Sequence, residues 1–322
     1  MLELALQNLI SPIVLSFVLG LVAAGLRSDL TIPEAVAKGL SLYLLFAIGF
    51  KGGVEVAAAG ASLQLLGGLA VGLVLSALLP LLAFALLRSI SRMSGTDAAA
   101  VAGHYGSISI VTFVAASGLL SSRGVSYEGW LVAVAAVMEA PAIVTAVWLA
   151  YRQRPDAEKA QMPWREVVLN GSVVLLAGSF LIGWATGPAG MAEVEGFLLV
   201  PFKGVLCLFL LDMGLLAGRN LMRNRSVLDP GAVVFALLMP LIGAAIGLAA
   251  AALLGLSAGG AALLATLTAS ASYIAVPAAM RVAVPEANPA IYLSLALGVT
   301  FPFNLILGIS IYLALAGHFM GL

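Results

Sequence analysis

Apolar residues run through this chain in segments of about twenty, separated by short polar stretches. One helix needs about 20 apolar residues to cross the hydrocarbon core of a bilayer. The pattern therefore predicts an all-α polytopic membrane protein with ten crossings, five on each side of a central polar loop. We place them at residues 7–26, 34–52, 63–87, 97–119, 127–151, 166–187, 197–218, 231–255, 259–281 and 290–316.

Composition supports a membrane protein. The chain is 62% hydrophobic and only 9% charged, with a net charge of zero, whereas a soluble domain has about a quarter of its residues charged. The single cysteine, Cys207, excludes a disulfide within the chain and a cysteine metal cluster. The first apolar segment starts at Glu3 without a basic region before it, so we expect a first membrane helix and not a cleaved signal. We expect a lipid bilayer around the protein and no nucleic-acid partner.

Two of the predicted crossings are interrupted by polar residues. The fourth contains Ala-Gly-His-Tyr-Gly-Ser-Ile-Ser-Ile at residues 102–110, and the ninth contains Thr-Ala-Ser-Ala-Ser-Tyr at residues 268–273. Inside a membrane, irregular backbone is tolerated only where it is buried in protein or lines a cavity. Paired interruptions in two halves point to the binding site of a transporter. We therefore predict that helices 4 and 9 are broken.

The two halves resemble each other. Lys38-Gly39 aligns with Lys203-Gly204 at an offset of 165 residues, and Ser107 aligns with Ser270 at an offset of 163. Because each half has five crossings, the second half would run through the membrane in the opposite direction, as an inverted repeat. We predict a first repeat at residues 1–151, a cytoplasmic linker at 152–165 and a second repeat at 166–322.

Basic residues fix the expected orientation. If the ten crossings alternate, eleven Lys and Arg residues of the loops fall on one side, and only Lys51 and Arg123 fall on the other. The eleven are Arg27, Arg88, Arg92, Arg152, Arg154, Lys159, Arg165, Arg219, Arg223, Arg225 and Arg281. The side richer in basic residues is usually cytoplasmic. We expect both termini outside, in the plasma (inner) membrane of a bacterium.

Glu139 and Asp212 lie deepest in apolar sequence. A charged group there costs roughly 3 kcal/mol or more, so such residues usually face water or an ion; a protonated or hydrogen-bonded acid at a helix contact is the alternative. Glu139 precedes Pro141, which lacks an N–H and frees a carbonyl nearby. Carboxylate and carbonyl oxygens suit a small hard cation. Thr300 and Asn304 flank a proline in the equivalent helix, so we predict cation sites at Glu139, Thr300, Asn304 and Asp212.

The interruptions themselves offer donors to an anion. A helix that restarts inside the membrane presents free N–H groups and the positive end of its dipole. Small residues and serines also allow close helix packing, which is the alternative for them. We predict a substrate site formed by Gly106, Ser107, Ser109, Ser270, Ser272 and Tyr273. His104 is either a proton relay or structural, and a lone histidine with no paired acid in the sequence favours the structural role.

Several motifs resemble the sodium-dependent bicarbonate transporter family best known from cyanobacteria. They are Ile-Pro-Glu-Ala at 32–35, Ile-Gly-Phe-Lys-Gly-Gly at 48–53, Val-Ser-Tyr-Glu-Gly-Trp at 125–130, Ala-Pro-Ala-Ile-Val-Thr-Ala at 140–146, Ala-Ser-Ala-Ser at 269–272 and Val-Pro-Glu-Ala-Asn-Pro at 284–289. The resemblance implies a five-plus-five inverted repeat with core and gate domains, sodium-coupled bicarbonate uptake and a homotrimer. It also implies that the substrate lies between the two breaks with sodium beside it. A regulator of the PII type is implied too, although the short central loop argues against it.

This chain departs from the family pattern at both breaks. His104-Tyr105 stands where family members have glycine and serine, and Tyr273 stands where they carry an aspartate. Val276-Pro277-Ala278 replaces Gly-Pro-Pro, while the acid before proline persists as Glu139. A missing acid removes a cation ligand, and an added phenol narrows the pocket.

We therefore predict a sodium-coupled symporter that imports bicarbonate or a similar small anion. Two alternatives stay open: a proton-coupled or uncoupled small-anion carrier, and a non-transporting membrane sensor on the same fold. The sequence shows no spaced Ser/His/Asp set, paired membrane aspartates or zinc signature, so we expect no enzyme and no cofactor beyond sodium as coupling ion.

Overall fold

The structure is a computed structural model that describes residues 12–60, 62–153, 171–223, 229–273 and 275–320. These residues form helices and no strands. The helices are α2 (Pro12–Gly25), α3 (Glu34–Ala59), α4 (Leu63–Ile90), α5 (Gly95–Gly106), α6 (Ile110–Ser122), α7 (Leu131–Val137), α8 (Glu139–Arg152), α10 (Gly171–Leu198), α11 (Phe202–Arg223), α12 (Pro230–Leu254), α13 (Ala258–Ala269), α14 (Ala275–Ala283), α15 (Pro289–Leu293), η2 (Ser294–Thr300), α16 (Phe301–Phe303), η3 (Asn304–Gly308) and α17 (Ile309–Met320), of which η2 and η3 are π-helical.

Within the described residues, seven helical segments are long and apolar enough to cross a membrane. Three of them join neighbouring helices: α5 with α6, α7 with α8, and α15 through α17. The prediction of an all-helical membrane protein is confirmed for this part of the chain. Helices α2 and α13 are apolar but shorter than a full crossing.

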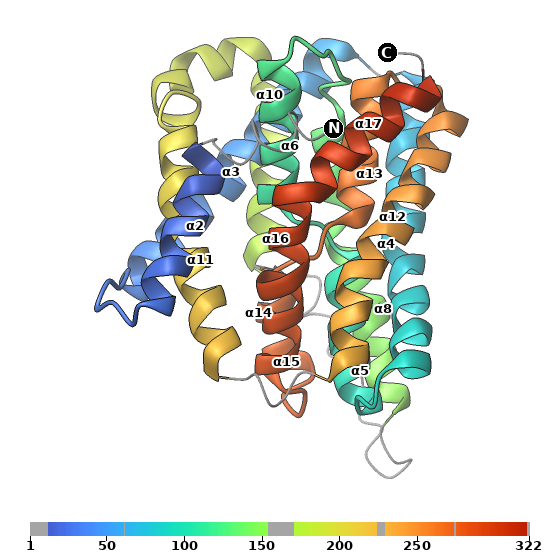
Figure 1. Ribbon diagram of the computed structural model, residues 1–322. Coiled ribbons are helices and arrows are strands. Elements are labelled where there is room, and N and C mark those ends of the chain that lie inside the picture. Colours follow the sequence, from blue (N-terminus) through green and yellow to red (C-terminus); the bar gives the residue numbers. More distant parts are fainter. Residues whose placement is uncertain (1–11, 61, 154–170, 224–228, 274, 321–322) are drawn as a thin grey trace.

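Four helices pair across the sequence on one side of the molecule, where α2 packs against α11 and α3 packs against α10 (Figure 1). Glycines let the first pair approach closely. A Cβ at Gly20 would overlap the carbonyl oxygen of Leu211, and a Cβ at Gly214 would overlap that of Phe17. Contacts of this kind replace hydrophobic driving force between helices in lipid.

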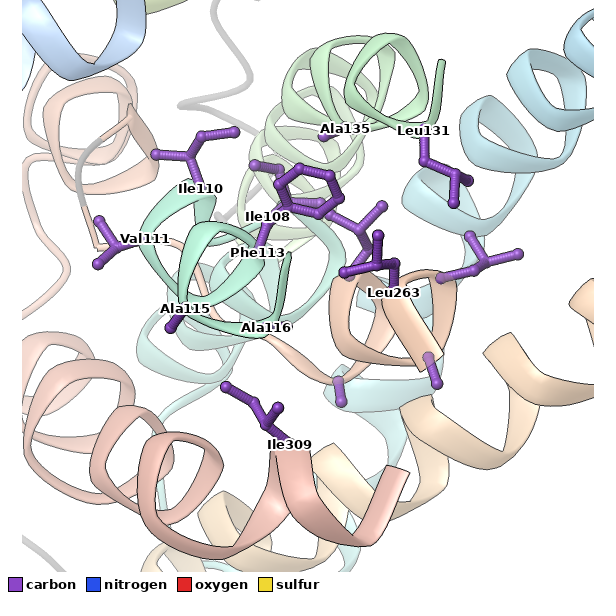
Figure 2. Close-up of a cluster of buried hydrophobic side chains, with 14 of the residues drawn as sticks. Ile108, Ile110, Val111, Phe113, Ala115, Ala116, Leu131, Ala135, Leu263 and Ile309 are labelled. Atoms are coloured by element: carbon purple, nitrogen blue, oxygen red, sulfur yellow. The ribbon is translucent and has the colours of Figure 1, made fainter. Parts of the chain in front are cut away.

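The other side of the molecule contains α4, α5, α8 and α12 (Figure 1), with α12 beside α13 and α13 beside α17. Helix α6 lies inside this group. Figure 2 shows its Phe113 and Ala116 among Leu131 of α7, Leu263 of α13 and Ile309 of α17. Helices α7, α13 and α17 therefore pack around α6, the second half of the interrupted segment (Figure 2).

Both polar interruptions end a helix. Helix α5 ends at Gly106 and α6 begins at Ile110, while α13 ends at Ala269 and α14 begins at Ala275. The first residue after each helix is an extended serine, Ser107 with φ −84° and ψ 166° and Ser270 with φ −83° and ψ 162°. In the α5–α6 segment 94% of the most apolar stretch is buried, against 17% in α10. The irregular backbone is thus shielded from lipid, as the membrane requires.

Two predicted crossings can be compared with the structure at their ends. The stretch labelled α10 consists of two helices, because Gly187, with φ 59° and ψ −156° ahead of Pro188, is not helical. The first of them ends at the expected residue 187, and the second continues to Leu198. The last segment is not one regular helix but changes to π-helix on both sides of Pro302. Most of the linker predicted at residues 152–165 lies outside the described residues.

Candidate functional site

The two interruptions contact each other through backbone and side-chain hydrogen bonds. The N–H of Ser109 donates to Oγ of Ser270 at 2.9 Å. The N–H of Ser272 donates to the carbonyl oxygen of His104 at 2.8 Å, and Nδ1 of His104 lies 2.5 Å from the carbonyl oxygen of Ser272. Segments more than 160 residues apart in sequence therefore form one polar junction in the interior.

Local sequence explains where the first break occurs. Ser109 begins α6 as an N-cap, because its Oγ accepts from the N–H of Thr112 at 3.2 Å and from Oγ1 of Thr112 at 2.8 Å. Gly106 ends α5 against α4, where a Cβ would overlap the ring of Pro80. Only glycine fits this contact, so the glycine in the motif serves packing at the break.

Glu139 lies beside the first break and is 4% exposed. Its carboxylate accepts from Oγ of Ser107 at 3.1 Å and from the backbone N–H of Ile108. Two donors from the break thus hold an acid that the sequence places in a different crossing. These hydrogen bonds stabilise a carboxylate in this position, which keeps acceptor capacity for a further ligand.

The helical segment around Glu139 lacks one of its backbone hydrogen bonds. Helix α7 ends at Val137 and α8 begins at Glu139. Oγ of Ser76, on α4, accepts from the N–H of Ala142 at 3.1 Å and donates to the carbonyl oxygen of Met138 at 2.5 Å. The serine hydroxyl therefore takes the place of the direct bond between Ala142 and Met138 and satisfies both groups.

A small cavity of ≈ 10 Å³ lies between the two breaks and the acid. It is lined by Leu45, Ile108, Ser109, Ile110, Glu139, Ser272 and Tyr273. This volume is about that of one water-sized sphere, which is the size of a small ion and less than bicarbonate needs. The predicted residues Ser109, Ser272, Tyr273 and Glu139 thus share one enclosed space.

Thr300 occupies a different place. Its Oγ1 donates to the carbonyl oxygen of Ala236 at 2.6 Å, so the hydroxyl of Tyr105, 2.7 Å away, must be the donor to Thr300. Ala236 is four residues before Pro240 in α12, and the proline has no N–H to give to that carbonyl. Thr300 therefore satisfies an acceptor that a proline leaves free.

Asn304 is the counterpart of Glu139 in the second half. Its Nδ2 donates to the carbonyl oxygen of Ala269, the last residue of α13, at 2.8 Å. Its Oδ1 accepts from the hydroxyl of Tyr312 at 2.7 Å. Glu139 and Asn304 each bond the broken helix of their own half, but in the second half both ends of the amide are engaged by protein groups.

Tyr273 also lines the small cavity. Its ring packs edge-on against Phe301 at 5.0 Å, and its side chain is 7% exposed. Its hydroxyl interacts with the side chain of Ser109 but forms no hydrogen bond of normal geometry among the described residues. A buried hydroxyl that is poorly paired is costly, so a bound ligand would improve its hydrogen bonding.

Asp212 lies apart from these residues. It is half-buried on α11, which packs against α2 and α3, and its nearest charge is Arg219, one to two turns further along the same helix. No hydrogen bond in the described part of the chain joins it to Glu139, Thr300 or Asn304. Nor does this part of the chain gather three His, Cys, Asp or Glu side chains in the manner of a transition-metal site.

His104 lies fully buried at the junction of the breaks. Its ring stacks on Tyr292 at 4.8 Å. Because a carbonyl oxygen only accepts, the contact with Ser272 places the proton on Nδ1. Its Nε2 has no partner among the described residues. These contacts agree with the structural role that the sequence favours.

Sequence reasoning missed two of the groups that build the site. Ser76 is the one hydroxyl of the crossing predicted at residues 63–87, and Tyr105 was noted only as a departure from the family pattern. Pro240 leaves the Ala236 carbonyl to Thr300, which in turn accepts from Tyr105. Ser76 bonds the backbone on both sides of Pro141, at Met138 and Ala142. A polar residue one helix away from a mid-membrane proline is the signal that could have found them.

Buried paired breaks with an acid beside them define a membrane protein of the transporter class. The family comparison gives the particular group. A model of the Na+-dependent bicarbonate transporter superfamily matches residues 12–317, and the chain belongs to that superfamily. No curated protein matches the chain. The resemblance read from the sequence motifs is thereby confirmed.

Proposed function

We propose that this protein is a sodium-coupled symporter that imports bicarbonate or a similar small anion. Membership of the superfamily supports the class, and the observation that carries the proposal is the meeting of the two breaks beside Glu139. Hydroxyl and N–H donors suit an oxyanion, and a buried carboxylate suits a small cation. The two ligand types have adjoining places in one interior junction.

The architecture we propose is ten crossings in two inverted repeats of five helices, with helices 4 and 9 broken. The seven long segments, together with α2, α11 and the α13–α14 pair, supply ten. The cross-pairing of α2 with α11 and of α3 with α10 supports an inverted relation between the halves. The basic face is proposed to be cytoplasmic in a bacterial plasma membrane.

The anion is proposed to bind at Ser107, Ser109, Ser270 and Ser272 after the junction opens. In the closed arrangement Oγ of Ser270 and the N–H of Ser109 bond each other, and Oγ of Ser109 caps α6. A small separation of the breaks would release these groups to a carboxylate-sized oxyanion. The ≈ 10 Å³ cavity supports a closed state in which the anion is excluded.

One sodium ion is proposed to bind at Glu139 in the small cavity. Glu139 and Tyr273 both line it. The amide of Asn304 and the hydroxyl of Thr300 are already bonded to protein groups, which supports one cation site and not two. A homotrimer is our proposal for the assembly, while the PII-type regulator stays a prediction, because most of the central loop lies outside the described residues.

Uptake of labelled bicarbonate into proteoliposomes tests the proposal. With an inward sodium gradient, uptake should exceed that into protein-free liposomes, and replacing sodium by choline should abolish it. Uptake that follows a proton gradient without sodium would establish the proton-coupled carrier instead. No uptake under any gradient, with labelled bicarbonate still binding, would establish the sensor.

A further inference from the structure

Two adjoining cavities lie on the side of the small cavity toward the end of α6, the first between α3, α6 and α11 and the second between α2, α6 and α11. The first has a volume of ≈ 320 Å³ and is lined by Lys51, Glu55, Ser117, Ser121 and Lys203 among others. The second has a volume of ≈ 390 Å³ and is lined by Arg123, Lys203 and Cys207. Ile13, Gly118 and Lys203 line both, so the cavities share a wall.

Positive charge predominates in these cavities. Lys51, Lys203 and Arg123 line them, and Glu55 is the one acid in the two linings. Nη2 of Arg123 is buried and has no hydrogen-bond partner within the described residues. Burial lowers the pKa of the Arg123 guanidinium from its ordinary value, a change that a neighbouring anion would oppose.

This positive cluster is unusual for its side of the membrane. Lys51 and Arg123 are the two loop-proximal cations that the crossing pattern assigns to the outer face. Lys203 lies in the first turn of α11, at the end of the predicted crossing 197–218 that the same pattern places at that face. Outer faces generally carry few lysines and arginines. The few that this chain has there converge on one space.

The first cavity leads toward the site. Leu45 of α3 and Ile110 of α6 line the small cavity between the breaks, and Ile48 and Phe113, each one helical turn farther along, line the larger one. Ile48 and Phe113 are buried, with 5% and 3% of their surfaces exposed. These two apolar side chains separate the basic cavity from the acid and the serines.

We propose that this space is an outer anion vestibule, in which Lys51, Lys203 and Arg123 collect a small oxyanion before it passes Ile48 and Phe113 to the breaks. The proposal rests on the proposed function for the identity of the anion. A cleft lined by charge of one sign raises the local concentration and the association rate of oppositely charged ligands by about 10- to 1,000-fold, and salt weakens the effect. The vestibule thus supplies affinity that the neutral donors at the breaks lack.

Thiol labelling measures the potential of the vestibule without requiring transport. The parent protein carries Cys207→Ser, which removes the only native cysteine, and Ser121→Cys, at an exposed position in the first cavity. The introduced thiol of this parent is labelled with two methanethiosulfonate reagents, the anionic sulfonatoethyl form and the cationic trimethylammonium-ethyl form. The ratio of the two labelling rates reports the local electrostatic potential. Adding Lys51→Gln or Lys203→Gln should lower the anionic-to-cationic rate ratio on the order of tenfold. Lys38→Gln, at an exposed position near the other end of α3, makes the same charge change and should leave the ratio unaltered.

Transport kinetics test the second half of the proposal. Lys51→Gln and Lys203→Gln should raise KM for labelled bicarbonate severalfold with little change in maximal rate, and Lys38→Gln should change neither. A rate ratio and a KM that do not respond to Lys51→Gln or Lys203→Gln would overturn the vestibule. A wild-type protein without anion uptake would instead remove the proposed function, while the labelling ratio would still decide whether the space attracts anions.

Discussion

The backbone N–H of Ser109 donates to Oγ of Ser270 at 2.9 Å, although the two serines are 161 residues apart in sequence. Each belongs to one of the two polar interruptions, and the contact joins the start of α6 to the end of α13. A serine hydroxyl can give its proton to the Leu267 carbonyl and still accept from Ser109, as Ser270 does. Junction and binding site are therefore built from the same groups.

Replacing Ser270 by alanine should destabilise the protein. The change leaves the buried N–H of Ser109 without an acceptor, which costs about 1–3 kcal/mol. Thermal unfolding in detergent measures this loss, and the affinity for bicarbonate should fall as well. Ser89→Ala is the matched control, since its hydroxyl is exposed and bonds only the Leu86 carbonyl of its own helix. Equal unfolding temperatures for the two variants would argue against the junction.

His104→Ala should lower stability without changing the coupling ion. It removes the donor to the Ser272 carbonyl and the ring stacked on Tyr292, and leaves a cavity in the interior. We expect a loss of about 2–4 kcal/mol. Sodium should still drive uptake in proteoliposomes made from this variant. Proton-driven uptake that is present in the wild type and lost in His104→Ala would give the histidine the relay role instead.

Thr300→Val should destabilise the protein, and the size of the loss should depend on whether residue 240 is proline. Valine keeps the shape but cannot donate to the Ala236 carbonyl, which leaves a buried acceptor unpaired at a cost of about 1–3 kcal/mol. In a Pro240→Ala background residue 240 regains an N–H for that carbonyl, so the same substitution should cost less. A double-mutant cycle by thermal unfolding measures the difference. Equal costs in both backgrounds, or a loss of sodium dependence in Thr300→Val, would instead favour a cation ligand.

Two substitutions at Tyr273 separate packing from ligand binding. Tyr273→Phe keeps the edge-on contact with Phe301 and removes a hydroxyl that forms no hydrogen bond of normal geometry in the described structure. Stability should be unchanged to within about 0.5 kcal/mol, while ligand affinity should fall. Tyr273→Asp restores the acid that family members carry and should raise the order or the affinity of sodium dependence. Sodium titration of uptake checks both, and a Tyr273→Asp protein with wild-type sodium dependence would show that position 273 faces no cation.

Much of this arrangement is accessible from the sequence. Polar residues such as Ser107 and Ser270 in long apolar segments predict the breaks, because lipid cannot satisfy them. The acid before Pro141, within an apolar segment, predicts a cation site flanking the breaks. The pairing of hydroxyls to carbonyls is less accessible, since Ser76 and Thr300 gain their roles only when particular helices lie side by side. Propensity and periodicity describe one helix at a time, whereas these contacts depend on the rotation of two helices about their axes.

The position of Asp212 shows the same limit. Its apolar surroundings in the sequence equal those of Glu139, and both satisfy the criterion of an acid within a crossing. The structure places Glu139 at the junction and Asp212 on α11, against α2 and α3. The position of an acid within an apolar segment does not reveal which face of the helix carries it.

The sodium dependence of bicarbonate uptake by the wild-type protein and by Glu139→Gln tests the central claim most directly. One carboxylate site predicts a hyperbolic dependence with a Hill coefficient near one, because Asn304 and Thr300 are bonded within the protein. Glutamine keeps the size of the side chain and the contact with Ser107 but removes the charge, so Glu139→Gln should abolish the sodium dependence. A wild-type Hill coefficient near two, or intact sodium dependence in Glu139→Gln, would contradict a single sodium site at Glu139.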